Sequence, residues 1–130
     1  MITTINLNKL PFLKKWFVTI GHTIYVPKKY WNRCNTISNF KLHNLPLFEH
    51  ENLHSVRQFD YGKNKWLLKY CLSKKFRWQE EKLTYTLELQ LRLKLGIFIS
   101  RAWYFKTLKK YNMANEKEIN EFLNSILGQN

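Results

Sequence analysis

The chain has few of the residues that build tight loops, disulfide frameworks or phosphate cradles. Its 130 residues include four glycines, three prolines and two cysteines. The glycines are isolated from one another, which excludes a Gly-rich phosphate-binding loop. Cys34 and Cys71 are far apart and form no C-x-x-C pair. We therefore expect two reduced thiols rather than a cysteine metal site or a disulfide scaffold.

Long apolar runs are also lacking. No run reaches the roughly 18 residues that a transmembrane helix needs. Residues 1–15 contain lysines but no acidic residue, and their apolar stretch is too short for a secretory signal. We expect them to form an irregular, extended entry segment. Because 45% of the chain is hydrophobic, it can bury one core, and a single domain over residues 1–130 is expected.

Acidic residues are scarce and unevenly placed. There are 22 Lys and Arg against nine Asp and Glu, which gives a formal net charge of +13. Residues 1–48 and residues 89–115 contain no acid at all. A soluble surface normally mixes both signs of charge. Two acid-free stretches therefore indicate a polyanionic partner, either a nucleic acid or an anionic membrane.

Composition also points to an AT-rich coding sequence. Asn occurs 13 times and Ala only twice, and the residues with AT-rich codons far outnumber those with GC-rich codons. Organelle genomes, endosymbionts and some phages have this bias. We expect a protein of the mitochondrial matrix that is encoded by an AT-rich organelle genome.

Residues 83–99 alternate without error. Every odd position from Leu83 to Ile99 is apolar, and most even positions are polar, among them Arg92 and Lys94. Period two is typical of a strand with one buried face, although Leu, Glu, Gln, Arg and Lys favour helices. We expect the pattern to prevail over the propensity. The predicted fold is α+β, with a small antiparallel sheet that includes this long strand.

Five other segments complete the predicted organisation. Residues 16–26 read as one strand bent at Gly21 or as a short hairpin through Gly21 and His22. Helices are expected at about 64–79, from Ser100 onward, and at about 116–127. The last of these has Asn115 and Glu118 placed as in a capping box. Residues 34–63, rich in Asn and interrupted by Pro46, are expected to be irregular.

Three histidines in this irregular segment are the best metal-ligand candidates. His50 and His54 are four residues apart and would share a helix face, with Glu49 and Glu51 close by. No third ligand of the zincin type follows in the sequence, and Pro46 and the neighbouring asparagines argue against a stable helix. We therefore expect His43, His50 and His54 to lie on a polar surface loop, with no bound metal or other cofactor.

Catalytic patterns are weak elsewhere. The pairs Glu80–Glu81 and Glu49/Glu51 could do acid–base chemistry only if a pocket shifted their pKa values. We expect them instead to balance nearby lysines. No serine or cysteine stands in a known nucleophile context. The sequence therefore predicts a protein that is not an enzyme and that has no small-molecule substrate.

Cations interleaved with aromatic rings are the strongest functional pattern. Cations can contact phosphates while flat rings stack on exposed bases. Four tryptophans are candidate stacking residues: Trp16, Trp31, Trp78 and Trp103. The candidate nucleic-acid-binding cations are Lys14, Lys15, Lys28, Lys29, Arg33, Lys74, Lys75, Arg77, Arg92, Lys94, Arg101, Lys106, Lys109 and Lys110.

These patterns lead to three functional hypotheses. The first is a structural RNA-binding protein, a mitochondrial ribosomal protein that contacts rRNA and neighbouring proteins of a large assembly. The second is an accessory subunit of a respiratory complex in the mitochondrial inner membrane, with its basic stretches against anionic lipid. The third is a phage-type DNA-binding or nuclease protein that uses His43, His50 and His54.

Overall fold

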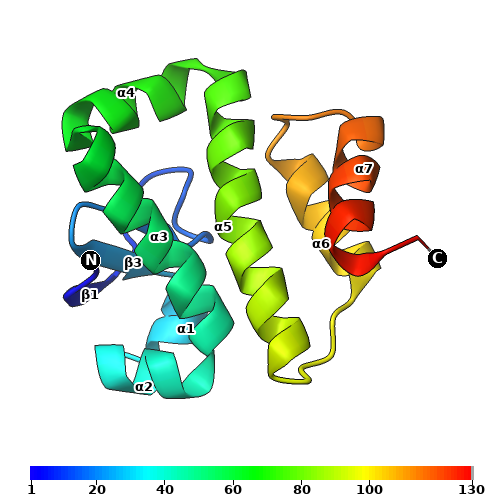
Figure 1. The fold of residues 1–130 in the computed structure, drawn as a ribbon. Coiled ribbons are helices and arrows are strands. Elements are labelled where there is room, and N and C mark those ends of the chain that lie inside the picture. Colours follow the sequence, from blue (N-terminus) through cyan, green and yellow to red (C-terminus); the bar gives the residue numbers. More distant parts are fainter. Residues whose placement is uncertain (130) are drawn as a thin grey trace. The chain divides into compact units, whose positions relative to one another are not determined.

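The computed structural model describes residues 1–129, which fold into seven helices and a three-stranded sheet. The α+β class is confirmed (Figure 1). The chain divides into two compact units, Met1–Trp66 and the part from Leu67 onward. Each unit is described below by itself. The expectation that they act as a single domain stays a prediction.

A small mixed sheet forms one layer of the first unit. It consists of β1 (Thr4–Leu7), β2 (Val18–Ile20) and β3 (Thr23–Val26), in the order β1-β3-β2. β2 and β3 form an antiparallel hairpin, whereas β1 pairs with β3 in parallel. The hairpin through Gly21 and His22 is confirmed, and Gly21 turns it with a positive φ of 61°. The prediction that residues 1–15 are wholly irregular is wrong, because they contain β1.

Two helices of the first unit occupy most of the segment 34–63 that was predicted to be irregular. They are α2 (Ile37–His43) and α3 (Leu45–Tyr61), and the short helix α1 (Lys28–Trp31) precedes them. The prediction failed because two residues taken as helix breakers begin helix α3. The side chain of Asn44 accepts a hydrogen bond from the Leu47 amide at 3.2 Å, and Pro46 lies in the first turn. Asn is favoured at the N-cap, and Pro is tolerated in the first turn because its missing N–H has no partner there anyway.

The core of the first unit is small and aromatic at its edge. Ile24 and Val26 of β3 are fully buried together with Phe40 of α2, and Phe48 of α3 packs on them. The rings of Phe40 and Phe48 meet edge to face, with their centroids 5.6 Å apart, which is a favoured aromatic geometry. Helix α3 lies across the sheet and contacts β2 (Figure 1).

Helix α4 (Lys63–Leu72) runs through the boundary between the two units, and α5 (Lys74–Lys94) follows it. The predicted helix at 64–79 is thus two helices. Ser73 is the N-cap of α5, and its Oγ accepts a hydrogen bond from the Phe76 amide at 3.1 Å. Arg77 then donates to the carbonyl oxygens of Tyr70 and Cys71, at 2.8 and 3.0 Å, at the end of α4. A cap and a carbonyl partner at one point end one helix and start the next.

The long strand predicted at 83–99 is wrong, because residues up to Lys94 belong to α5. Its buried positions recur at helical spacing, in one row with Tyr85 and Leu89 and in a neighbouring row with Glu80, Thr84 and Glu88. One buried row is mainly apolar and the other is polar, so the helix does not need a single apolar face. The strong helix propensity of these residues therefore prevailed over the period-two alternation of apolar and polar residues. The antiparallel sheet is correspondingly smaller than expected, and it is mixed.

Two further helices complete the second unit, α6 (Arg101–Lys110) and α7 (Glu116–Leu127). Both were predicted and are confirmed. The Asn115 side chain accepts from the Glu118 amide at 2.8 Å, and Glu118 accepts from the Asn115 amide at 3.1 Å, so the capping box is also confirmed. None of the helices in residues 1–129 has the length and apolar character of a membrane span.

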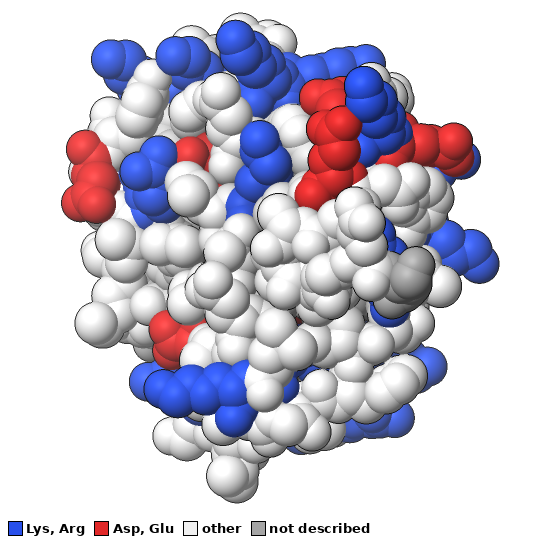
Figure 2. Space-filling view, turned by 45° about the vertical axis from the view of Figure 1, so that its right-hand side comes forward, with Lys and Arg blue, Asp and Glu red and all other residues white. Residues whose placement is uncertain are grey.

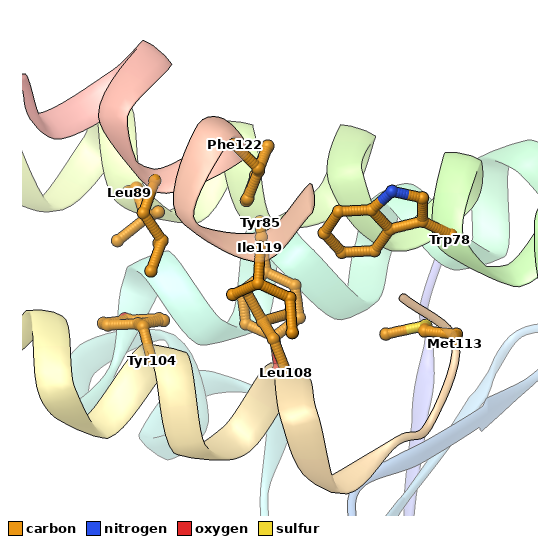
Figure 3. Close-up of a cluster of buried hydrophobic side chains, with 9 residues drawn as sticks. Trp78, Tyr85, Leu89, Tyr104, Leu108, Met113, Ile119 and Phe122 are labelled. Atoms are coloured by element: carbon orange, nitrogen blue, oxygen red, sulfur yellow. The ribbon is translucent and has the colours of Figure 1, made fainter. Parts of the chain in front are cut away.

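The core of the second unit lies between α5, α6 and α7 and is almost entirely apolar (Figure 3). Leu89 of α5, Leu108 of α6 and Ile119 of α7 are fully buried. The ring of Trp78 meets that of Phe122 edge to face, with centroids 5.6 Å apart. This core has more buried residues than that of the first unit.

Candidate metal centre

Helix α3 buries a polar face against a small sheet. His50, Glu51 and His54 are 3%, 5% and 6% exposed, and Ser55 and Gln58 are fully buried. Buried ionisable groups are rare in proteins unless they are paired or bind a metal. The buried polar face therefore marks α3 as the place to look for function.

The three ionisable residues of this face form a compact group. One potential ligand atom from each residue, a ring nitrogen of each histidine and a carboxylate oxygen of Glu51, lies within 4.8 Å of the other two. Nε2 of His50 is 3.9 Å from Oε1 of Glu51, and the two imidazole rings have centroids 5.0 Å apart. In a tetrahedral zinc site the ligand atoms are about 3.4 Å apart, given bonds of about 2.0 Å. Within residues 1–129 this is the one group of three His, Cys, Asp or Glu residues whose potential ligand atoms lie within 4.8 Å of one another.

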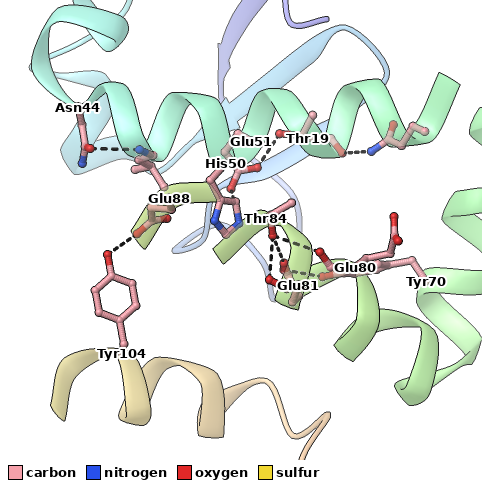
Figure 4. Close-up of polar contacts among 12 residues, drawn as sticks. Thr19, Asn44, His50, Glu51, Tyr70, Glu80, Glu81, Thr84, Glu88 and Tyr104 are labelled. Carbon is pink, nitrogen blue, oxygen red and sulfur yellow. Dashed lines mark hydrogen bonds and ion pairs between the residues drawn. The ribbon is translucent and has the colours of Figure 1, made fainter. Parts of the chain in front are cut away.

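The Glu51 carboxylate is held from the sheet (Figure 4). Thr19, the central residue of β2, donates its hydroxyl proton to Oε2 of Glu51 at 2.7 Å, and both side chains are buried. This contact fixes the rotamer of Glu51. The carboxylate is thereby kept beside His50, its neighbour in sequence.

Helix α3 is itself fastened to the hairpin by side chains one and two turns beyond Glu51. Gln58 donates from Nε2 to the Thr19 carbonyl oxygen and accepts at Oε1 from the Gly21 amide, both at 2.7 Å. Ser55 donates to the Gly21 carbonyl oxygen at 2.7 Å. These three bonds satisfy backbone groups along the open edge of β2. They fix where α3, and with it the group of His50, Glu51 and His54, lies on the sheet.

The expectation of a polar surface loop at these histidines is wrong. His50 and His54 lie on a helix and are buried, and the His54 ring meets Trp66 edge to face, with centroids 5.8 Å apart. His43 is not part of the group. It lies exposed in the last turn of α2, with its ring 5.6 Å from that of Tyr30.

Glu51 is the functional candidate that the sequence reasoning undervalued. Residues 50–54 read His-Glu-Asn-Leu-His, which is an H-E-x-x-H pattern. On a helix that pattern places two histidines on one face with a glutamate beside them. The signal was present in the sequence, but it carries meaning only if the segment is helical. Because Asn44 and Pro46 were interpreted as helix breakers, the segment was not predicted to be helical and the pattern received no weight.

The paired carboxylates of α5 are also placed differently from the expectation. Glu80, Glu81 and Glu88 are buried, whereas surface positions were expected for Glu80 and Glu81. Thr84 donates to Oε2 of Glu81 at 3.1 Å, and Tyr70 donates to Oε1 of Glu81 at 3.0 Å. Glu88 accepts from the Tyr104 hydroxyl (Figure 4) and also from Arg92. Within the second unit the carboxylates of Glu81 and Glu88 thus have structural hydrogen-bond partners.

The candidate nucleic-acid-binding cations lie mostly at the surface. Figure 2 shows Lys and Arg side chains spread over much of one face, with acidic side chains in a few groups. The exposed members are Lys14, Lys15, Lys28, Lys29, Arg33, Lys74, Lys75, Lys94, Lys106, Lys109 and Lys110.

Four of the candidate nucleic-acid-binding cations have partners within their own unit. Arg77 contacts the end of α4, and Arg92 lies 3.4 Å from Glu88. Arg101 donates to Asn124 and to the Gly128 carbonyl oxygen, while Lys109 lies 2.7 Å from Glu116. The three arginines are therefore structural residues in this fold.

The candidate stacking tryptophans differ in how far their side chains are exposed. Trp103 is 56% exposed and Trp16 is 36% exposed, whereas Trp31 is partly buried beside the core of the first unit. Trp78 is only 6% exposed and packs on Phe122. Trp78 is therefore a core residue, and the interpretation of it as a stacking surface is wrong.

Comparison with protein-family models, with curated proteins and with solved structures gave no match to this chain. The functional argument therefore rests on the residues and their geometry.

Proposed function

We propose that the protein is a metal-dependent hydrolase whose centre is the group of His50, Glu51 and His54, with zinc as the metal and a peptide bond as the target. The observation that carries the proposal is this buried group, with its potential ligand atoms within 4.8 Å on one face of a helix. Two imidazoles are nitrogen donors that suit zinc, and the carboxylate beside them is placed to act as a base. The H-E-x-x-H pattern on a helix is typical of zinc peptidases.

The chemistry assigns a role to each side chain. His50 and His54 would hold the metal through their imidazole nitrogens, and the metal, when bound, would lower the pKa of a bound water and polarise a carbonyl group. Glu51, next to His50, accepts the proton of the attacking water as general base. Thr19 is a positioning residue, because its hydroxyl bonds the other oxygen of the same carboxylate. A divalent cation also offsets the cost of burying a carboxylate.

Metal content is the first test. The protein as isolated, or after dialysis against zinc, is expected to hold about one equivalent of zinc by elemental analysis, as a single site requires. The double variant His50→Ala/His54→Ala is expected to lose it. His43→Ala is the matched control, because this exposed histidine lies outside the group. Retention of zinc by the double variant would rule out the centre.

Activity is the second test. The zinc-loaded protein is assayed on a mixture of fluorogenic peptides and, separately, on plasmid DNA. Glu51→Gln is expected to keep zinc and to lose peptide hydrolysis by about 100-fold or more, as loss of a general base requires. If Glu51→Gln loses zinc, Glu51 is a ligand rather than a base. Cleavage of DNA but not of peptides would support the metal centre and overturn the proposed substrate class, in favour of the nuclease hypothesis.

A second candidate function, the structural RNA-binding protein of a mitochondrial ribosome, is favoured by a different observation. The loop of residues 9–16 exposes Lys14, Lys15 and Trp16, and hydrogen bonds from one buried side chain hold its shape. The buried Asn8 donates from Nδ2 to the carbonyl oxygens of Leu13 and Trp16, at 2.8 and 2.7 Å. A prearranged loop with cations beside a ring suits phosphate contact and base stacking, as structured RNA demands.

This second candidate is tested by native pull-down with sequencing of bound RNA. Enrichment of rRNA, reduced in Lys14→Glu/Lys15→Glu, would support it. The substitutions lie at exposed positions, so the fold is expected to be retained. Recovery of the protein without rRNA would rule out a ribosomal role, whatever the outcome of the zinc experiments.

A further inference from the structure

Five large apolar side chains are exposed close together in the second unit. They lie in the last turn of α5, in the connection that follows, and in the first turn of α6. We call them the apolar tip: Leu93, Leu95, Ile97, Phe98 and Trp103, which are 53%, 51%, 39%, 87% and 56% exposed. A single exposed apolar residue needs no explanation, but a group of them indicates an interaction surface.

Backbone hydrogen bonds, rather than apolar packing, hold this connection in shape. Gly96, at a φ of 68°, ends α5, and the amides of Gly96 and Ile97 donate to the carbonyl oxygens of Leu93 and Arg92 at 3.2 and 2.9 Å. This is a helix C-terminal cap of the Schellman kind. Ser100 then caps α6 by accepting from the Trp103 amide at 3.2 Å. The apolar tip is therefore a shaped surface whose side chains are not used to build the core.

The charge around the apolar tip is of one sign. Residues 89–115 contain six Lys or Arg and no acid. Lys94 is exposed beside Leu93 and Leu95. On α6, Trp103, Lys106 and Lys110 are all exposed and follow one another at spacings of three and four, so they share a face of the helix. The apolar tip thus has cations on both the α5 side and the α6 side.

We propose that the apolar tip inserts into the interfacial region of an anionic lipid bilayer. Aromatic residues favour the headgroup level, and lysines beside them attract anionic headgroups. The three aliphatic members favour lipid over RNA, because aliphatic side chains gain from burial in hydrocarbon but do not stack on bases. This surface is separate from the proposed metal centre and does not depend on it.

Co-sedimentation of the whole protein with lipid vesicles tests the proposal. Binding is expected to vesicles that contain phosphatidylserine, and to be much weaker with phosphatidylcholine alone. Phe98→Ala/Trp103→Ala should lower the partition coefficient by at least about tenfold, because two large apolar side chains are removed from the bilayer. Leu72→Ala is the matched control. Leu72 is 77% exposed in the same unit but lies outside the apolar tip, and its substitution should leave binding unchanged.

The contribution of the lysines to vesicle binding is tested separately. Lys94→Glu/Lys106→Glu should lower binding to phosphatidylserine vesicles and reduce its dependence on salt. All four substituted residues are exposed, and circular dichroism verifies that the fold is kept. Equal vesicle binding by the Phe98/Trp103 variant and the wild type would overturn the proposal. Vesicle binding that does not depend on lipid charge would also overturn it. So would a loss of RNA affinity in the Phe98/Trp103 variant without a loss of vesicle binding.

Discussion

The two units of the chain use their buried polar side chains differently. The first packs a small aromatic core beside a buried polar face, in which Thr19, Ser55 and Gln58 reach backbone or carboxylate groups. The second packs three helices around a larger core, and its buried carboxylates Glu81 and Glu88 accept hydrogen bonds from the side chains of Tyr70, Thr84 and Tyr104. Apolar burial stabilises a fold without making it specific for any chemistry. Buried polar groups cost stability unless each is satisfied, so they are informative about function.

The strongest way to test this contrast is to remove apolar bulk from the second unit. Leu89 is fully buried between the helices (Figure 3). Leu89→Ala should lower the free energy of unfolding by about 2–5 kcal/mol, from lost burial and the cavity left behind. Urea denaturation followed by circular dichroism measures this change. Leu93→Ala, on the same helix but 53% exposed, is the control and should change it by less than about 0.5 kcal/mol. Equal effects would mean that the core is assigned wrongly.

The corresponding change in the first unit removes polar contacts instead of bulk. Gln58→Ala leaves the Gly21 amide and the Thr19 carbonyl group without their side-chain partner. The expected loss is about 2–3 kcal/mol, since buried backbone groups lose their hydrogen bonds. Hydrogen exchange of the Gly21 amide reports the local effect, which should be faster exchange. If that amide stays protected, the attachment of α3 to the hairpin does not depend on Gln58.

Alkaline pH should affect the second unit through its buried tyrosines. Burial, followed by the Glu88 carboxylate, raises the pKa of the Tyr104 hydroxyl above its usual value, and burial likewise raises the pKa of Tyr85. Because the folded pKa exceeds the unfolded value near 10, both contributions to stability are complete below pH 10 and decrease as the pH rises beyond it. The slope is at most about 1.4 kcal/mol per pH unit for each tyrosine.

Denaturant midpoints measured from about pH 9 to about pH 11 bracket the ordinary tyrosine pKa and test this slope. Tyr104→Phe should lower this slope by the contribution of one tyrosine, whatever the variant's stability at neutral pH. In the first unit burial also raises the pKa of Tyr30, so Tyr30→Phe provides the comparison. An unchanged slope in Tyr104→Phe would show that this hydroxyl titrates normally.

The smallest expected effect on stability concerns Thr19. Thr19→Val keeps the shape of the side chain but removes the hydroxyl that bonds Glu51. The loss should be about 1–2 kcal/mol, and Thr19→Ser should restore most of it. If the proposed function holds, peptide hydrolysis falls in Thr19→Val and recovers in Thr19→Ser while zinc content stays constant in both. Equal hydrolysis by the two variants would leave Thr19 with no part in positioning Glu51.

Local signals carried much of the fold prediction. The α7 helix followed from Asn115 and Glu118 as a capping box, and the hairpin from Gly21 between β-branched residues. Both signals act within a few residues of the structure that they specify. Pro46 and Asn44 misled the prediction because the same residues that break a helix also begin one. Their effect depends on which side of them the apolar pattern continues.

The candidate site was only partly predictable. His50 and His54 were identified by their spacing, but their burial depends on β2, which is 30 residues away in sequence, and on the Thr19 contact. No local pattern shows that a hydroxyl on one strand will meet a carboxylate on a later helix. The predicted cations were mostly placed correctly at the surface. Trp78 was not, because ring burial is decided by the Phe122 contact across two helices.

The alternation in α5 has a consequence for how the chain folds during synthesis. Residues 83–94 are helical here, yet their period-two pattern also fits a strand, and the two structures use the same leucines for different neighbours. Until α6 and α7 have been made, nothing in the second unit's core covers Tyr85 and Leu89. During that interval the segment is a nascent strand-forming sequence with exposed leucines, which is a hazard for intermolecular pairing. The last helices of the chain therefore protect it from aggregation as well as stabilising it.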